Sequence, residues 1–197
     1  MNRVDYFATP VFTFDVQYDN ESLVAWAKQK NDMQVPNQHG GMQSFNTADK
    51  LNNDTMQHNF PFAFVNLQKI LQGHIDTVAN ELEFPKVNLQ NYWLNVNPYG
   101  SCNDVHNHPN ALLVANYYIK APSTSIGDIV IHRDDESQYY TSSIPNKNKI
   151  TQRQVNVTPH TGLFIVFPGW VKHSVNTNLD KNNDRISLSL NYGRTEK

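Results

Sequence analysis

The second half of the chain consists of short apolar runs that are separated by polar residues. From residue 87 onward, six runs rich in β-branched and aromatic side chains follow one another, with Pro, Gly, Asn or Asp between them. Runs of this length and composition predict β-strands. They are VNLQNYWLNVNP (87–98), ALLVANYYIK (111–120), GDIVIHR (127–133), RQVNVTP (153–159), GLFIVFP (162–168) and RISLSLNY (185–192).

The first half of the chain has a different pattern. Residues 6–16 are aromatic and β-branched and predict a strand, and residues 21–32 predict a short helix. Residues 31–60 are rich in Asn, Gln and Gly and predict a long loop that could act as a flap over a site. A second helix is expected after Pro61, where apolar residues recur at helical spacing. These residues are Phe64, Leu67, Leu71, Ile75, Val78 and Leu82.

Helices followed by many short strands predict a mainly β protein in which a sandwich or barrel is flanked by helices. No internal repeat or linker interrupts the chain, so we expect a single domain over residues 1–197. Its first strand and its helices would lie in 1–86, and its β core would lie in 87–193.

Composition narrows the class of protein. The 197 residues carry a formal charge of −2, and no block of Lys or Arg stands out, which argues against a nucleic-acid partner. Cys102 is the single cysteine, so a disulfide framework is excluded. No signal-like segment begins the chain, and no stretch approaches 18 apolar residues. We therefore expect a cytoplasmic protein without a membrane partner. Nothing in the sequence indicates the oligomeric state.

Three histidines form a candidate metal site. His106 and His108 are two residues apart, and side chains at this spacing share one face of a strand. His173 follows the apolar run 162–168 and a Pro-Gly turn. A metal needs ligands that converge from different strands, and neutral imidazoles suit Fe, Zn, Cu or Ni. The pair and the distant histidine together predict such a site.

A candidate anion-binding residue lies on the last predicted strand. Ile186, Leu188, Leu190 and Tyr192 alternate there with a polar set that begins at Arg185. The polar face carries Arg185, Ser187, Ser189 and Asn191. Arg185 and Ser187 therefore lie on the same side of the sheet, where a guanidinium can make a two-pronged contact with a carboxylate and a hydroxyl can add a third donor.

Two families with the same fold resemble this pattern. Gly100, five residues and His106-x-His108 resemble the first cupin motif, and Gly162, Pro168 and His173 resemble the second. The cupin glutamate expected after the H-x-H pair is absent, however. The glycine expected two residues after the proline is replaced by Trp170.

The second resemblance covers roughly residues 90–193. The chain resembles the prolyl-hydroxylase-like branch of the 2-oxoglutarate/Fe(II)-dependent dioxygenases. It is similar in detail to a subgroup of oxygenases found in marine bacteria and their phages, which shares the sequence motifs WLNVN…G…H-x-HP and FP…H. The segments that carry the resemblance are VHNHPNALLVANYYI (105–119), GDIVIHRDD (127–135), TGLFIVFPGWVKHSV (161–175) and RISLSLNY (185–192).

This resemblance implies a double-stranded β-helix, also called a jelly roll or cupin-like core. It implies Fe(II) at His106, His108 and His173, and 2-oxoglutarate at Arg185, Ser187 and Tyr118. It also implies that O2 is consumed and that a peptidyl or small-molecule C–H bond is hydroxylated. The reaction would proceed through a ferryl-oxo species and release succinate and CO2. The substrate stays undetermined. Candidate cavity residues are Trp93, Asn95 and Asn97, which alternate on one predicted strand.

The chain departs from the usual family triad of two histidines and one carboxylate, because His108 stands in the carboxylate position. Either His108 is the ligand here or Asp104, on the same strand face as His106, supplies a carboxylate. An inactive metal site is a further alternative. So is a cupin-type three-histidine protein that acts without 2-oxoglutarate as an isomerase, another dioxygenase or a small-molecule binder. A non-enzymatic β-sandwich would hold no metal.

Overall fold

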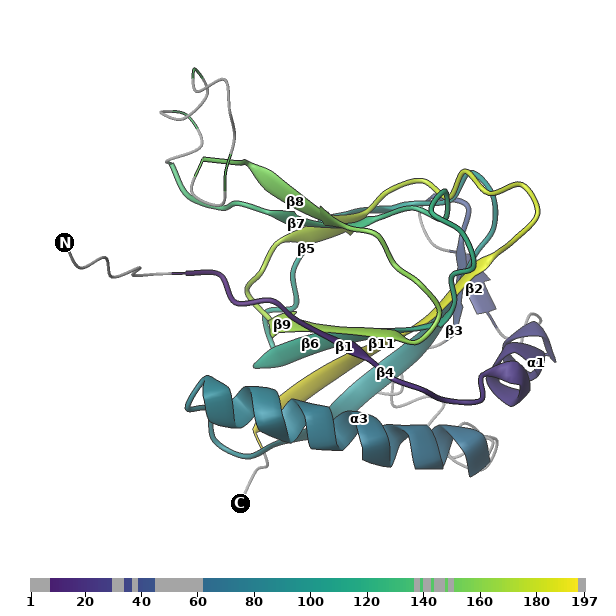
Figure 1. Cartoon of the computed structure of the whole chain (residues 1–197), viewed down its shortest axis with the longest axis horizontal. Coiled ribbons are helices and arrows are strands. Elements are labelled where there is room, and N and C mark those ends of the chain that lie inside the picture. The colour runs from purple at the N-terminus through teal and green to yellow at the C-terminus, as the bar shows by residue number, and fades with distance from the viewer. Residues whose placement is uncertain are drawn as a thin grey trace.

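A computed structural model describes residues 8–29, 34–36, 39–44, 62–136, 139, 143, 148 and 151–194. Its strands form two antiparallel sheets that face each other (Figure 1). The strands are β1 (Phe12–Asp15), β2 (Gln34–Pro36), β3 (Met42–Ser44), β4 (Val87–Asn97), β5 (Asn103–His106), β6 (Leu113–Lys120), β7 (Ile129–His132), β8 (Gln154–Val157), β9 (Leu163–Pro168), β10 (His173–Val175) and β11 (Arg185–Arg194).

The larger sheet has seven strands in the order β1-β9-β6-β11-β4-β3-β2, and the smaller sheet has the order β5-β10-β7-β8. Strand β11 lies in the middle of the larger sheet, between β6 and β4. It pairs with both neighbours along most of its length, so its side chains have fixed positions on both faces. The β11 residues that point between the sheets are therefore well placed to build a site.

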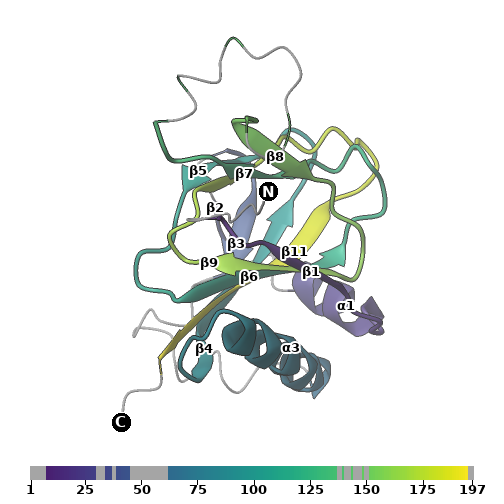
Figure 2. The same ribbon diagram turned by 60° about the vertical axis from the view of Figure 1, so that its left-hand side comes forward.

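Two helices flank the larger sheet, α1 (Glu21–Gln29) and α3 (Phe62–Glu81). Helix α3 lies along the outer face of this sheet, opposite the smaller sheet (Figure 2). The helical spacing expected after Pro61 is confirmed, since Leu67, Leu71 and Ile75 are fully buried. Each such side chain contributes about 1.5 to 3 kcal/mol when it leaves water. No helix in the described ranges has the length and apolar character needed to cross a membrane.

The alternation of apolar and polar side chains predicted for residues 185–192 is confirmed. Ile186, Leu188, Leu190 and Tyr192 join the apolar cluster beneath α3. A second apolar cluster lies between the two sheets and takes side chains from β6, β9 and β7. The two clusters hold the outer and inner faces of the larger sheet, so its strands stay fixed while polar side chains occupy the rest of the space between the sheets.

The prediction of a long loop over 31–60 is wrong in part. Strands β2 and β3 pair with each other, and β3 extends the larger sheet along the edge of β4, with Met42 opposite Val96. These strands are short and polar, so local pattern does not reveal them, and the open edge of β4 supplies their partner. Residues 45–60, including His58, lie outside the described residues. The prediction of a single domain stays a prediction.

Candidate functional site

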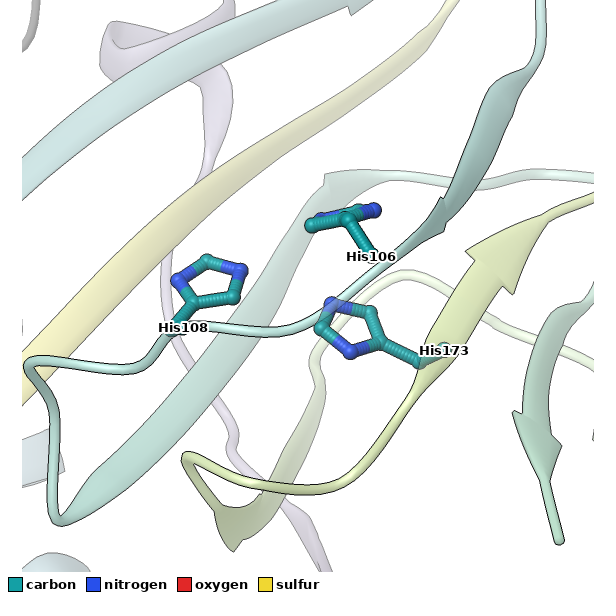
Figure 3. A group of neighbouring side chains, drawn as sticks. All are labelled: His106, His108 and His173. Carbon is teal, nitrogen blue, oxygen red and sulfur yellow. The ribbon is translucent and has the colours of Figure 1, made fainter. Parts of the chain in front are cut away.

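The three predicted histidines meet between the two sheets. His106 ends β5 and His173 begins β10, and these residues are directly paired across the two strands. His108 lies two residues beyond the end of β5. Each histidine offers one ring nitrogen, and the three nitrogens lie within 4.8 Å of one another. Figure 3 shows the three rings turned toward one common point. This spacing fits three ligands of a single metal ion.

The sequence argument placed these residues correctly but for a different structural reason. His108 lies outside the strand, so a shared strand face does not explain its position. Its backbone N–H donates to the carbonyl of Gly169 at 2.9 Å, which fastens the segment after β5 to the turn before β10. His173 does not end the run 162–168. That run is β9 in the larger sheet, and His173 opens a separate strand of the smaller sheet.

Backbone carbonyls determine the protonation of two of the rings. Nδ1 of His106 lies 2.7 Å from the Asp104 carbonyl oxygen, and Nδ1 of His173 lies 3.0 Å from the Val171 carbonyl oxygen. A carbonyl oxygen only accepts hydrogen bonds, so Nδ1 carries the proton in both rings. Nε2 of each neutral ring therefore keeps its lone pair for a metal.

The third ring has a side-chain partner. Nδ1 of His108 lies 2.7 Å from Oδ1 of Asn191, so Nδ1–H donates to the amide oxygen. Nε2 of His108 is buried and has no hydrogen-bond partner within the described ranges. A buried nitrogen without a partner is costly unless a ligand occupies it, and a metal ion would satisfy this one.

Burial lowers the pKa of two of the histidines, His173 and His108. Desolvation, with help from the neighbouring His106, lowers the pKa of His173 to about 3. Desolvation also lowers the pKa of His108, although its hydrogen bond to Asn191 partly opposes the shift. Metal ligation needs the unprotonated imidazole, so these two rings are ready to bind a cation at neutral pH.

The carboxylate of Asp104 lies outside this cluster. Its Oδ2 is 2.7 Å from Nε2 of His39, and the Asp104 side chain is 67% exposed. Within the described ranges, the group of side chains close enough to share a metal contains the three histidines and no carboxylate. The geometry therefore favours His108 over Asp104 as the third ligand.

The histidines open into a cavity of about 950 Å³ between the sheets. Most of its lining side chains are uncharged and able to form hydrogen bonds, and carboxamides predominate. The carboxamides are Gln43, Gln90, Asn91, Asn95, Asn97, Asn103, Asn107, Asn110, Asn116 and Asn191. Such walls suit a ligand that is rich in hydrogen-bonding groups.

A buried cation lies at the wall of this cavity. Arg185 is 1% exposed, and its Nη1 donates to the carbonyl oxygens of Ile126 at 2.6 Å and Asn176 at 3.2 Å. Its Nη2 is buried without a hydrogen-bond partner among the described residues. The ion pairs between described residues include none with this guanidinium. Burial lowers the pKa of Arg185 and raises the pKa of the neighbouring Tyr118 to about 12. Tyr118 and Ser187 also line the cavity.

Two glycines leave room for the atoms that surround the guanidinium and the histidine cluster. A Cβ on Gly127, which has a φ of 94°, would clash with Arg185 Nη1 and with the carbonyl oxygen of Asn176. A Cβ on Gly169 would clash with the carbonyl oxygen of His108. Glycine is therefore required beside both the cation and the histidine cluster.

The three candidate cavity residues of β4 all line the cavity but differ in their contacts. The Trp93 ring stacks on the His108 ring, with centroids 5.7 Å apart and planes 11° apart. Nδ2 of Asn95 donates to Oγ of Ser189 at 3.0 Å. Nδ2 of Asn97 is buried without a partner. Trp93 thus supports the histidine cluster, Asn95 belongs to the wall, and Asn97 leaves a donor free.

The contact between Asn191 and His108 was missed by sequence reasoning. The strand alternation correctly put Asn191 on the face of Arg185, but nothing local links residue 191 to residue 108. His39, in the segment that the sequence predicted as a flap, also lines the cavity. The alternation of apolar and polar residues shows which face of the sheet a side chain lies on. Its hydrogen-bond partner becomes known only from the packing of segments that are distant in the chain.

Comparison with protein families gives one match. The model of the family described as "Putative 2OG-Fe(II) oxygenase" matches residues 91–191, which include all three histidines and Arg185. A search of curated proteins matches none to this chain.

Several solved structures share the fold. A prolyl-4-hydroxylase from Pseudomonas putida aligns with a TM-score of 0.66 and 12% identity, covering 95% of this chain and 94% of the other. HygX from Streptomyces hygroscopicus, solved with nickel, 2-oxoglutarate and hygromycin B, aligns with a TM-score of 0.64 and 12% identity, covering 95% and 84%. The α-ketoglutarate-dependent carbocyclase SnoK from nogalamycin biosynthesis gives 0.64 and 12%, covering 93% and 79%. The predicted double-stranded β-helix is confirmed.

Proposed function

The chain belongs to the 2OG-Fe(II) oxygenase family, and from this membership we propose that it is an Fe(II)- and 2-oxoglutarate-dependent hydroxylase. Its substrate would be a peptide or a small molecule with a reactive C–H bond. The observation that carries the proposal is a cavity that joins three converging imidazoles to a buried guanidinium with a donor that has no partner among the described residues.

The histidine cluster fits an iron ion. His106, His108 and His173 would each bind it through Nε2, because Nδ1 of each ring already donates to an oxygen. Imidazole is a suitable ligand for Fe(II), and three ligands leave positions for a chelating cosubstrate and for O2. When bound, the iron and 2-oxoglutarate would supply the oxidation of the C–H bond, with release of succinate and CO2.

The guanidinium fits the distal carboxylate of 2-oxoglutarate. A buried cation without a counterion is unstable, and a ligand carboxylate would supply the missing charge and the missing acceptor. The two carbonyls that hold Nη1 of Arg185 keep Nη2 in place for this contact. Ser187 and Tyr118, which line the same cavity, can donate their hydroxyl protons to the carboxylate. Burial keeps the Tyr118 hydroxyl protonated and thus able to donate.

The cavity walls support a substrate with hydrogen-bonding groups. Ser189 Oγ donates to Asn116 Oδ1 at 2.8 Å and accepts from Asn95, so this part of the wall is held rigidly. A peptide backbone or a polar metabolite matches such a wall better than a hydrocarbon does. Hydroxylation of a peptide is favoured by the extent of the alignment with the bacterial prolyl-4-hydroxylase, which spans nearly all of both chains.

A second candidate function follows from the missing carboxylate. A three-histidine metal protein could act without 2-oxoglutarate as an isomerase, another dioxygenase or a small-molecule binder. Such a protein would have no use for an unpaired guanidinium buried at the cavity wall. The donor left free on Arg185 therefore ranks this candidate second.

An anaerobic titration separates the two candidates. Fe(II) and 2-oxoglutarate are added to the metal-free protein, alone and together, while the visible metal-to-ligand charge-transfer band is followed. We expect a band that requires both components and is lost in Arg185→Ala at the 2-oxoglutarate concentration that saturates the wild type. Tight iron binding without any band would favour the candidate that does not use 2-oxoglutarate.

A further inference from the structure

The three histidines differ in what holds their Nδ1 proton. His106 and His173 each donate to a backbone carbonyl two residues earlier, Asp104 and Val171 respectively. Such a local contact depends on the backbone and survives most side-chain changes. His108 instead donates to Asn191, which is 83 positions away in the chain. The tautomer of His108 is therefore set by one particular side chain.

The orientation of the Asn191 amide is itself fixed. Its Nδ2 donates to Oδ1 of Asn91 at 2.8 Å, and the two residues are paired across β11 and β4. Because the NH2 group is committed to Asn91, the carbonyl end of the amide faces His108. An amide turned the other way would offer a donor to Nδ1 and would place the His108 proton on Nε2.

The plane of the His108 ring is fixed by a second contact. The Trp93 ring stacks on the His108 ring, with planes 11° apart. Stacking determines the plane of the imidazole, and the Asn191 bond determines which nitrogen keeps its lone pair. Together they leave Nε2 buried, unprotonated and without a partner among the described residues.

We propose that Asn191 is a positioning residue that makes His108 a metal ligand, and that Asn91 acts through it. The inference rests on the proposed metal centre. It concerns the position at which this chain has a histidine in place of the usual carboxylate. The amide pair shows that this replacement comes with its own support on two central strands. Such support favours a functional three-histidine site over an inactive one.

The first test measures Fe(II) affinity of the metal-free full-length protein by anaerobic calorimetry, without cosubstrate. Asn191→Leu keeps the approximate volume but removes the acceptor, and loss of such a partner weakens metal binding roughly 10-fold to 100-fold. Asn191→Asp keeps an acceptor and places a negative charge behind the ring, so we expect affinity at or above that of the wild type. Asn156→Leu, the same substitution at an exposed position of β8 outside the cavity lining, is the matched control and should leave Fe(II) affinity unchanged.

The second test reads the His108 tautomer directly, in the absence of metal. Long-range proton–nitrogen correlation spectra of the histidine side chains distinguish a protonated Nδ1 from a protonated Nε2. We expect His108 to carry its proton on Nδ1 in the wild type and in Asn191→Asp. In Asn191→Leu we expect a mixture or a shift to Nε2. A fold-level defect would instead alter the spectra of His106 and His173 as well.

The outcomes separate the two proposals. If Asn191→Leu keeps both the Nδ1 tautomer and the full Fe(II) affinity, the role of Asn191 is overturned while the metal centre stands. If the wild-type protein binds no Fe(II), the metal centre fails, and the positioning role fails with it. A tautomer shift in Asn191→Leu together with weaker Fe(II) binding, and no change in Asn156→Leu, supports the proposal.

Discussion

Arg185 and Asn97 are paired across β11 and β4, and each ends in a buried nitrogen that has no hydrogen-bond partner in the part of the chain that the structure describes. Both side chains are 1% exposed and line the cavity. Unsatisfied buried donors are rare, and two on paired residues indicate that an acceptor-rich ligand belongs there. A carboxylate has enough lone pairs to accept from both.

Removing either donor should weaken 2-oxoglutarate binding. A hydrogen bond to a charged group contributes about 1.5 to 3 kcal/mol. Arg185→Ala should therefore lower the affinity for 2-oxoglutarate by roughly 10-fold to 100-fold. Asn97→Ala should have a smaller effect in the same direction. Titration of the iron-loaded protein by the charge-transfer band gives these affinities. Asn95→Ala is the control for Asn97, because its amide is already bonded to Ser189. Equal 2-oxoglutarate affinity in wild type and Arg185→Ala would contradict the assigned pocket.

The assignment of His108 rather than Asp104 as the third ligand predicts opposite effects on Fe(II) binding when each of these two residues is replaced. His108→Ala and His173→Ala should each lose Fe(II) binding, since each removes one of the three converging nitrogens. Asp104→Ala should retain Fe(II) binding, because its carboxylate contacts His39 and lies outside the cluster. Anaerobic calorimetry with Fe(II) alone measures all three variants. Full affinity in His108→Ala combined with loss in Asp104→Ala would reverse the assignment.

Replacing His108 by Asp should change the charge of the centre but keep the metal. The variant exchanges a neutral ligand for an anion, so the iron site becomes less electropositive by one charge. We expect Fe(II) to bind still, and azide to bind the iron-loaded variant roughly tenfold or more weakly than the wild type. Two unit charges a few ångströms apart in a partly solvated site interact by about 1 to 4 kcal/mol. Azide titration of both proteins by absorption spectroscopy tests this, and equal azide affinities would refute it.

The metal-free protein should lose stability in acid. The folded chain holds His173 with a pKa of about 3, below its ordinary value of 6.5, so the unfolded chain binds more protons between these values. The free energy of unfolding should therefore decrease as pH falls from about 6.5 toward 3, by up to about 1.4 kcal/mol per pH unit from this residue. His108, whose pKa is also lowered, adds to the effect in the same direction.

Urea unfolding at a series of pH values measures this dependence. His173→Leu removes the titrating group, so its stability should depend less steeply on pH over the same range. An unchanged slope in His173→Leu would show that other groups cause the acid sensitivity.

Local pattern determined much of the fold. The alternation along 185–192 separated the core face of β11 from the cavity face, and helical spacing identified the buried face of α3. Both succeed because side-chain direction follows directly from backbone period. The metal-ligand candidates were found from the spacing of His106 and His108 and from a distant histidine near a strand, a combination that suits ligands converging from different strands. Strands β2 and β3 were missed, because a polar strand forms only when an open edge is available for pairing.

The tertiary structure decided what these residues contact. Only the packing of β5 against β10 brings His106 to His173, and only the alignment of β11 with β4 gives His108 the acceptor that frees its Nε2. The choice between His108 and Asp104 was open in the sequence, because both lie within two residues of His106. It depends on a contact between His39 and Asp104 across 65 positions. The period of the hydrophobic pattern specifies which face of a strand or helix a side chain occupies, and composition specifies which side chains could bind a metal. The histidine tautomers, the unpaired donors and the choice of the third ligand depend instead on distances between residues that are far apart in the chain.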